Sequence, residues 1–357
     1  MIYAPIIIPT LNRSSHFIRL IDSLKRNNWA RYTDVYVSVD FPPSEKYRKG
    51  WKLICDYLDN GDFSEFASLT VFKQKENLGA SKNSRILINY VKEHYDRWIR
   101  TNDDAEFAPN FLEYMDKCLD AFEDDPDVVA VTGYSYPVDW DVDLEATCFK
   151  QNFCASMWGT GFWKQKRTKM EEYIRPGTML ADLDRVIQNK TYKRMIDASL
   201  RDYIPVAVLP IRRINRMMYS LSDIGIRAYL AVADKYFISP VISKVRDHGF
   251  DGSGFYCQTI SDNLNGNTAG TYNYSQQPID ESDTFELVLD TKQNDKENHD
   301  RLNRFDVRTP AEMRRTRLYL WLMTHFGVWA GKACAIMLFP FDFGLRAFRK
   351  IWRTIKK

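Results

Sequence analysis

Two adjacent carboxylates, Asp103 and Asp104, stand in the stretch "IRTNDDAEFAPNF" directly after a short apolar run. Carboxylate oxygens are the ligands that hard divalent cations prefer, and such a cation neutralises the charge of a diphosphate. A second interpretation stays open, because acids before a helix are stabilised by the positive end of its dipole and "APNFLEYM" follows at once. A helix N-terminus needs only one acid at its cap, so the pair predicts either a cation site or a helix start.

The elements that must position this pair alternate along the first third of the chain. Apolar runs at residues 3–8, 35–39, 69–72, 97–101 and 128–133 are expected strands, and segments with helical spacing of apolar residues separate them. This alternation predicts an α/β fold with a mostly parallel, doubly wound, Rossmann-like sheet. Ligands of such sheets bind at the carboxyl ends of the strands.

Polar residues follow several of these expected strands. Asp40 comes after the second strand, Asn77 after the third, and Asp103 and Asp104 after the fourth. Because the carboxyl ends of parallel strands meet at one edge of a sheet, we expect these side chains to converge there. The sequence therefore predicts a ligand site at this edge.

Composition and cysteine usage narrow the class of protein. With 357 residues, 45% of them hydrophobic, the chain can bury a substantial core. The six cysteines show no CxxC spacing and lie among apolar neighbours, which is typical of reduced core cysteines in a cytoplasm. The N-terminal "MIYAPIIIPT" lacks a basic segment and a cleavage site, so we do not expect a signal peptide.

The C-terminal region combines aromatic and basic residues. Residues 313–357 hold ten Lys or Arg and one acid, Asp342. His325 and Lys332 interrupt the apolar span 314–341, and a central Lys costs about 3 kcal/mol on membrane insertion. The last segment places its apolar side chains on one helical face: Leu345, Phe348, Ile351, Trp352 and Ile355. This pattern is typical of a helix lying on an anionic membrane, and a helix packed on the main domain is the alternative.

Six segments of the chain carry a family resemblance through their types and their order. "PTLNR", "ENLG" and "NDDAEFAPNFLEYM" resemble nucleotide-diphospho-sugar glycosyltransferases of the GT-A fold, the last being similar to the Glu-Asp-Asp region of the N-acetylglucosaminyltransferase I family. "SMWGTGFWKQK", "SDIGIRAYL" and "HGFDGSGFYC" are similar to segments of bacterial polysaccharide glycosyltransferases. The resemblance covers residues 1–257.

The resemblance implies a role in the donor site for each matching residue. Asp104 is the implied metal ligand, and Asp103 the implied contact to the ribose or donor sugar. Asp40 is the implied acceptor of hydrogen bonds from the base of the nucleotide. The implied contacts to the nucleotide, ribose and phosphates are Pro9, Thr10, Asn12, Arg13, Asn77, Gly79 and Lys82. Local alternatives stay open, since Thr10 and Asn12 suit the cap of a helix beginning near Ser14, and Lys82 suits a solvated helix face.

Two later segments supply further implied ligands. Trp158 and Gly159 are expected to line the donor or acceptor pocket, with core packing as the alternative for the tryptophan. His248 is expected to complete the metal shell, as a late histidine does in many GT-A enzymes, and a structural hydrogen bond is its alternative. The glycines of "GFDGSG" would let the backbone approach the diphosphate closely.

An inverting transfer needs a base that takes the proton of the acceptor hydroxyl. Asp223 is the candidate, because it lies in the apolar context "YSLSDIGIR". The family pattern has Trp after this aspartate, and here Ile224 takes that place. The N-cap of a helix "IGIRAYLAVADKY" is the alternative role for Asp223, and Asp182 and Asp184 are further candidates for the base.

The sequence thus predicts an inverting glycosyltransferase that depends on Mn²⁺ or Mg²⁺ and a nucleotide-diphospho-sugar donor. It would transfer a hexosyl or N-acetylhexosaminyl group to a lipid-linked glycan in bacterial surface polysaccharide biosynthesis, such as lipopolysaccharide O-antigen or capsule. We expect a GT-A domain at 1–257, a polar linker or irregular extension at 258–312 and membrane-associating helices at 313–357. The chain would lie peripherally on the cytoplasmic face of the inner membrane, without a nucleic-acid partner. The alternatives are a retaining transferase, a nucleotidyltransferase on a similar sheet and a non-catalytic sugar-nucleotide-binding membrane protein.

Overall fold

The computed structural model describes residues 2–174, 223–254 and 272–306, together with short stretches between 318 and 338. Contacts divide the chain into two compact units, Met1–Met170 with Lys235–Asp306, and Glu171–Asp234 with Val307–Lys357. Asp182, Asp184 and the expected basic helix at 344–357 lie outside the described residues.

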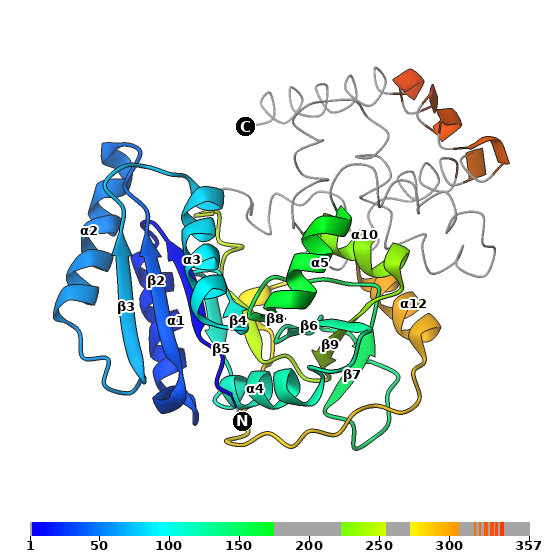
Figure 1. Ribbon diagram of the computed structural model, residues 1–357, viewed down its shortest axis with the longest axis horizontal. Helices are drawn as coiled ribbons and strands as arrows, with labels where there is room; N and C mark the ends of the chain where they lie inside the picture. Colours follow the sequence, from blue (N-terminus) through cyan, green and yellow to red (C-terminus); the bar gives the residue numbers. More distant parts are fainter. Residues whose placement is uncertain are drawn as a thin grey trace. The chain divides into compact units, whose positions relative to one another are not determined.

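An eight-stranded sheet forms the centre of the first unit, in the order β3-β2-β1-β4-β8-β6-β9-β7 (Figure 1). Most strands share one direction: β1 (Ile6–Thr10), β2 (Asp34–Val39), β3 (Ser68–Lys73), β4 (Arg97–Arg100), β6 (Val128–Thr132) and β9 (Tyr236–Pro240). Only β7 (Cys148–Gln151) and β8 (Thr160–Trp163) run against them within the described sheet. The expected α/β architecture with a mostly parallel sheet is confirmed.

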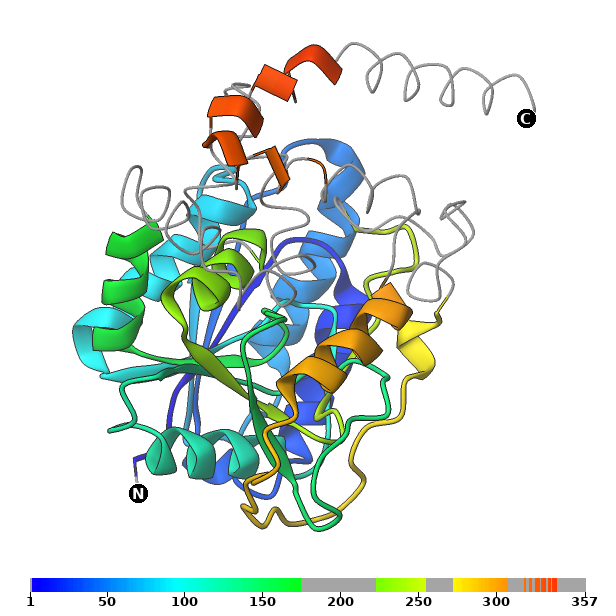
Figure 2. The same ribbon diagram turned by 90° about the vertical axis from the view of Figure 1, so that its right-hand side faces the viewer.

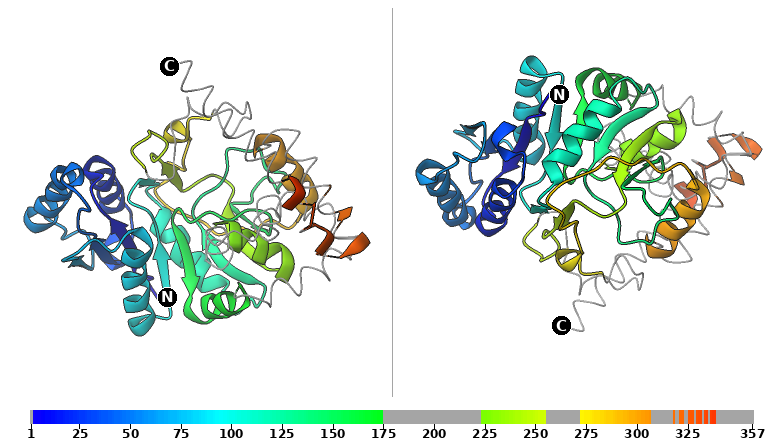
Figure 3. Two further views of the ribbon diagram at one scale, coloured as in Figure 1. Left: turned by 90° about the horizontal axis from the view of Figure 1, so that it is seen from above. Right: turned by 90° about the horizontal axis from the view of Figure 1, so that it is seen from below.

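Helices cover both faces of this sheet (Figure 3). One apolar cluster joins Ile6 and Ile8 to α1 (Ser14–Lys25), α2 (Glu45–Asn60) and α4 (Phe111–Ala121). The opposite face carries α3 (Ala80–His94), where Asn83 accepts a hydrogen bond from Ser38 Oγ (2.5 Å) and donates one to the Ser38 carbonyl (3.0 Å). Successive strand residues point to opposite faces, so Ser38 faces α3 while its neighbours in β2 face α1. Strands buried on both faces, with helices on either side, form the doubly wound layers that were expected.

A small second sheet lies at the carboxyl end of β4. There β5 (Ala105–Phe107) pairs antiparallel with β10 (Val245–Asp247), opposing Asp247 to Ala105 and Arg246 to Glu106. The strands are about 140 residues apart in sequence, and β5 directly follows the aspartate pair. This pairing brings the segment "DHGFDGSG" to the edge where ligands were expected.

The segment expected as a linker belongs to the first unit where it is described. α12 (Asp295–Asp306) contributes Leu302 to a cluster with Trp140, Phe149 and Phe153, and Figure 2 shows this helix in orange. Leu289 of the same segment forms a single parallel bridge with Cys148. The described residues 272–306 thus belong to the first compact unit, together with the central sheet.

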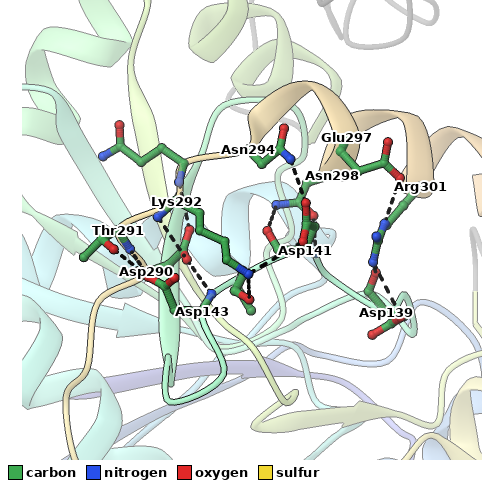
Figure 4. Close-up of polar contacts among 12 residues, drawn as sticks. Asp139, Asp141, Asp143, Asp290, Thr291, Lys292, Asn294, Glu297, Asn298 and Arg301 are labelled. Carbon is green, nitrogen blue, oxygen red and sulfur yellow. Dashed lines mark hydrogen bonds and ion pairs between the residues drawn. The ribbon is translucent and has the colours of Figure 1, made fainter.

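Polar contacts join residues 139–143 to residues 290–301 (Figure 4). The Asp143 carboxylate accepts from the Thr291 amide (2.8 Å) and hydroxyl (2.6 Å). Asn294 Nδ2 donates to Asp141 (2.6 Å), and Arg301 Nη1 donates to the Asp139 carbonyl (2.6 Å). These contacts explain why so polar a segment is ordered: its side chains find partners on the loop before β7.

The C-terminal region is described only in part. Within that part, no helix is long and apolar enough to cross a bilayer. Its described residues expose several large apolar side chains: Leu318, Trp321, Phe326, Trp329, Ile336 and Met337. The five described cysteines are free: Cys55, Cys118, Cys148, Cys154 and Cys334.

Candidate functional site

Side chains from three segments meet at the carboxyl edge of the sheet. Thr10 ends β1, Arg13 precedes the first residue of α1, and Asp103 and Asp104 follow β4. Thr10 Oγ1 donates to Asp103 Oδ2 (2.9 Å), and Arg13 donates to Asp103 and pairs through Nη1 with Asp104 Oδ2 (2.8 Å). Asp103 and Asp104 are each only 6% exposed. Of the side chains predicted to converge, Asp103 and Asp104 meet Thr10 and Arg13, while no hydrogen bond or ion pair among the described residues joins them to Asp40 or Asn77.

Neither the aspartate pair nor Thr10 and Asn12 cap the helices for which a capping role was the alternative. β5 separates Asp103 and Asp104 from α4, whose N-cap is Asn110. Arg13 stands at the N-cap of α1 without a side-chain cap, and the Thr10 hydroxyl is engaged with Asp103. Asn12 lies in the turn before α1, where its carbonyl accepts from the Ser14 amide (3.0 Å), and Pro9 pairs with Ser38 inside the sheet. The aspartate pair serves the edge of the sheet and not a helix start.

Asp247 is a third carboxylate in this group, which sequence reasoning missed. Its place in β10, opposite Ala105, sets it beside Asp104. Its Oδ1 accepts from the Gly249 amide (2.7 Å). A Cβ on Gly249 would lie closer than 3.0 Å to Asp104 Oδ2, so only glycine lets this backbone pass the carboxylate. The conspicuous "RDHGFDGSG" run was the available signal, but its pairing with β5 is not visible in the sequence.

Charge and burial shift the protonation of this group. Burial, and then the charge of Asp104, raises the pKa of Asp247 to about 8. Burial also raises the pKa of Asp103, although Arg13 opposes this effect. Burial alone would lower the pKa of Arg13, but the two neighbouring carboxylates outweigh it and raise that pKa. Three buried carboxyl groups thus share one guanidinium, and the raised pKa values show that the group favours a further proton or cation.

Asp104 and Asp247 are the residues that could hold a divalent cation. Asp104 Oδ1 and Asp247 Oδ2 are buried and have no hydrogen-bond partner within the described structure. Such atoms are rare in native proteins, and oxygen-ligated cations satisfy them. No three His, Cys, Asp or Glu side chains of the described residues form a complete metal cage. A Mg²⁺-type cation needs only one or two carboxylates, because waters and substrate phosphates complete its shell, so the residues fit such an ion.

His248 takes the structural role that was its alternative. Side chains alternate along β10, so Arg246 and His248 lie on the side opposite to Asp247. His248 Nε2 is 2.7 Å from Glu106 Oε2, and Arg246 Nη1 donates to the same oxygen (3.2 Å). The hydrogen bond from His248, with the charge of Arg246, lowers the pKa of Glu106 to about 2. The ring therefore fixes the β5–β10 pair, and the metal role assigned to His248 has no support in this arrangement.

Asp40 organises the loop before α3. Its oxygens accept from the amides of Phe41 (2.9 Å), Leu78 (2.8 Å) and Gly79 (2.8 Å), and from Asn77 Nδ2 (3.3 Å). A carboxylate has about four acceptor positions, so these donors occupy Asp40 and leave its predicted contact to a base without a free acceptor. Gly79 has φ +76, which favours glycine, while Lys82 is exposed on α3.

Trp158 and Gly159 lie against the aromatic residues beside this edge. The Trp158 ring packs edge-on against Tyr134, with centroids 4.6 Å apart, and against Phe250 of the "GFDGSG" run at 6.2 Å. The Gly159 carbonyl accepts from the Gly133 amide (2.7 Å). Trp158 is half-buried, so it serves the packing role proposed as its alternative while part of the ring stays accessible.

His16 was also missed by sequence reasoning. It lies one turn after Arg13 on α1 and is buried, with Nε2 3.0 Å from Asp251 Oδ2 and 3.3 Å from Ser253 Oγ. These contacts hold the "GFDGSG" loop on α1, so the loop and Arg13 share one helix as their support.

Asp223 is the first residue of α10 (Asp223–Ala233) and is exposed. This position agrees with the alternative of a helix start. It belongs to the second unit, whereas the carboxylate group belongs to the first. Its role as a base stays a prediction.

No protein-family model and no curated protein sequence matches this chain. Among solved structures it is similar to S. aureus TarS, with a TM-score of 0.32 and 13% identity over 46% of this chain and 29% of that one. It is also similar to TarS 1–349 in complex with UDP-GlcNAc, with a TM-score of 0.29 and 14% identity over 40% of this chain and 38% of that one. A third similar structure is the mannosyltransferase PcManGT from Pyrobaculum calidifontis in complex with GDP-Man and Mn²⁺. Its TM-score is 0.32, with 13% identity over 65% of this chain and 74% of that one. The chain spans less than half of either TarS chain, and similarity at these scores carries no argument about its function.

Proposed function

We propose that this chain is a glycosyltransferase that uses a nucleotide-diphospho-sugar donor and a divalent cation. One observation carries the proposal: Asp104 and Asp247, each with a buried unpaired oxygen, meet beside Arg13 at the carboxyl edge of a mostly parallel sheet. Cations and phosphates bind at such an edge. The order of the six sequence segments supports glycosyl transfer over other phosphate chemistry.

The residues of the edge have separable roles in this reaction. The acceptor hydroxyl oxygen attacks the anomeric carbon, the bond from that carbon to the diphosphate breaks, and the hydroxyl proton passes to a base. Mn²⁺ or Mg²⁺ held by Asp104 and Asp247 would offset the charge of the departing nucleoside diphosphate. Thr10 holds Asp103 in a fixed position for the ribose or donor sugar.

The stereochemistry and the transferred sugar belong to the proposal in finer detail. An inverting reaction with Asp223 as the base is supported by the resemblance of "SDIGIRAYL" to bacterial polysaccharide glycosyltransferases. The same resemblance favours a hexosyl or N-acetylhexosaminyl group as the transferred sugar.

The C-terminal region suggests where the acceptor lies. The aromatic side chains of Trp321 and Trp329 are 47% and 69% exposed, and ten basic residues accompany them in residues 313–357. Aromatic and basic residues together favour the interface of an anionic membrane. We therefore include a lipid-linked glycan as acceptor, at the cytoplasmic face of the inner membrane, in the synthesis of a surface polysaccharide such as O-antigen or capsule.

Thermal shift with a panel of sugar nucleotides, with and without Mn²⁺, tests the proposed function. We expect one donor to raise the Tm of the wild type only with Mn²⁺, and Asp104→Ala to lose this shift. Asp223→Ala should keep the shift and lose turnover. Asp300→Asn, an exposed change in α12, is the matched control and should behave as the wild type. If no donor shifts the wild type, or if Asp104→Ala binds and turns over normally, the proposed function is wrong.

A further inference from the structure

Arg13 pairs with one oxygen of Asp104 and leaves the other oxygen to the predicted cation. Its Nη1 lies 2.8 Å from Asp104 Oδ2, its other terminal nitrogen donates to Asp103, and its side chain is 18% exposed. Asp104 thus presents one oxygen to Arg13 and keeps the other unpaired. The guanidinium is anchored only by charge and hydrogen bonds, at the N-cap of α1.

Arg13 and a bound cation would both serve as the counter-charge of the three carboxylates. Asp103, Asp104 and Asp247 are nearly buried, and Arg13 is the only Lys or Arg in the described part of the chain that forms an ion pair with any of them. Buried carboxylates without a counter-charge are unfavourable, so Arg13 stabilises the group when no cation is bound. A divalent cation at Asp104 supplies that charge itself and repels the guanidinium at short range.

We propose that Arg13 is a placeholder for the cation: a cation that binds Asp104 displaces the guanidinium, which then becomes available to the diphosphate of the donor. This inference rests on the proposed function. It assigns Arg13 a positioning role in which the guanidinium changes its partner from Asp104 to the diphosphate. A planar guanidinium suits either partner, because it pairs with carboxylates and phosphates in the same two-pronged way. The cation and the donor then each raise the affinity for the other, because each favours the separation of Arg13 from Asp104 that the other requires.

Mn²⁺ binding measured by electron paramagnetic resonance tests the placeholder, with no donor present. Removal of the competitor should let Arg13→Ala bind Mn²⁺ about tenfold more tightly than the wild type, within the usual range of coupling between sites. Arg13→Lys keeps one charge but cannot reach both carboxylates in the same way, so its affinity should lie between the two. Lys25→Ala is the matched control, because it removes one positive charge from the same helix at a surface pair with Glu65 (3.5 Å).

The outcomes separate the placeholder role of Arg13 from the proposed function. Equal Mn²⁺ affinity of the wild type, Arg13→Ala and Arg13→Lys, with loss of binding in Asp104→Asn, overturns the placeholder and leaves the proposed function standing. No Mn²⁺ binding by any variant overturns both. If Arg13→Ala does not fold, NMR of the wild-type arginine side chains gives the same decision: Mg²⁺ should shift the Arg13 Nε–H signal, and an unchanged signal at saturating Mg²⁺ overturns the placeholder.

Discussion

Asp247 carries the proton that a cation must displace. Because burial and Asp104 raise its pKa to about 8, Asp247 is mostly protonated at pH 6 and mostly ionised above pH 8. Protons and Mn²⁺ compete for the same oxygens. We therefore expect the Mn²⁺ affinity of the wild type to rise from pH 6 through pH 8 and to level off about one pH unit above the pKa, as measured by titration at each pH. Asp247→Asn should bind more weakly, about tenfold at pH 8, and lose this dependence, and a pH-independent wild type would contradict the assignment.

A substitution at Gly249 tests the close approach of the backbone to the Asp104 carboxylate. In Gly249→Ala the added Cβ would lie within 3.0 Å of the Asp104 carboxylate and must displace it. We expect loss of most Mn²⁺ binding, with a destabilisation of about 1–3 kcal/mol, in denaturant titrations. Gly79→Ala is the comparison, because its Cβ meets nothing within 4 Å and only the positive φ is unfavourable. That variant should cost about 1 kcal/mol and keep Mn²⁺ binding, and equal loss of binding in both would count against the account.

The sequence predicted the residues of the site that lie at strand ends and missed those that depend on distant pairing. Thr10, Arg13 and the aspartate pair converge because parallel strands end together, which apolar runs reveal. Asp247 reaches Asp104 through a pair of three-residue strands about 140 residues apart, which has no local signal. His248 was assigned to the metal by analogy, and the alternation of side chains along β10 turned it to Glu106 instead.

At the scale of elements, Lys166 joins α5 (Lys164–Ile174) to the end of α4. Its Nζ donates to the carbonyls of Phe122, Asp125 and Val128, each at 2.8 Å, and lies over the Trp163 ring. Lys166→Met would leave these carbonyls without that donor, so we expect a loss of about 2–3 kcal/mol in the free energy of unfolding. Lys169→Met, an exposed change on the same helix, should stay within about 0.5 kcal/mol. If Lys166→Met lost no more free energy of unfolding than Lys169→Met, water would replace the lysine as donor to these carbonyls.

The predictability of an element depended on its length and its neighbours. Apolar runs and helical periodicity located α1 to α4 and the strands β1 to β4 and β6, because these elements place many apolar side chains in the core. β7 and β8 are four residues each and run against the sheet, so neither alternation nor length distinguished them. Residues 290–301 looked like a linker because side-chain contacts to residues 139–143, and not apolar periodicity, hold them in place.

At the scale of the whole molecule, the C-terminal region should direct the chain to membranes. If Trp321 and Trp329 enter the interface, the double change to Ala should lower binding to vesicles containing anionic lipid by about tenfold in sedimentation assays, with an unchanged Tm. Leu144→Ala is the control, because it removes another exposed apolar side chain outside this region. Binding that persists in the double variant would place membrane recognition elsewhere.

The central claim is that Asp104 and Asp247 together hold a cation at the carboxyl edge of the sheet. The most direct test is a crystal of the full chain grown with Mn²⁺ and UDP, with an anomalous difference map recorded at the manganese edge. The account predicts one peak within about 2.0–2.6 Å of an oxygen of each carboxylate, the range of oxygen ligands around Mg²⁺ and Ca²⁺. A peak bound to neither aspartate, or a nucleotide bound elsewhere with no peak at this edge, would contradict it.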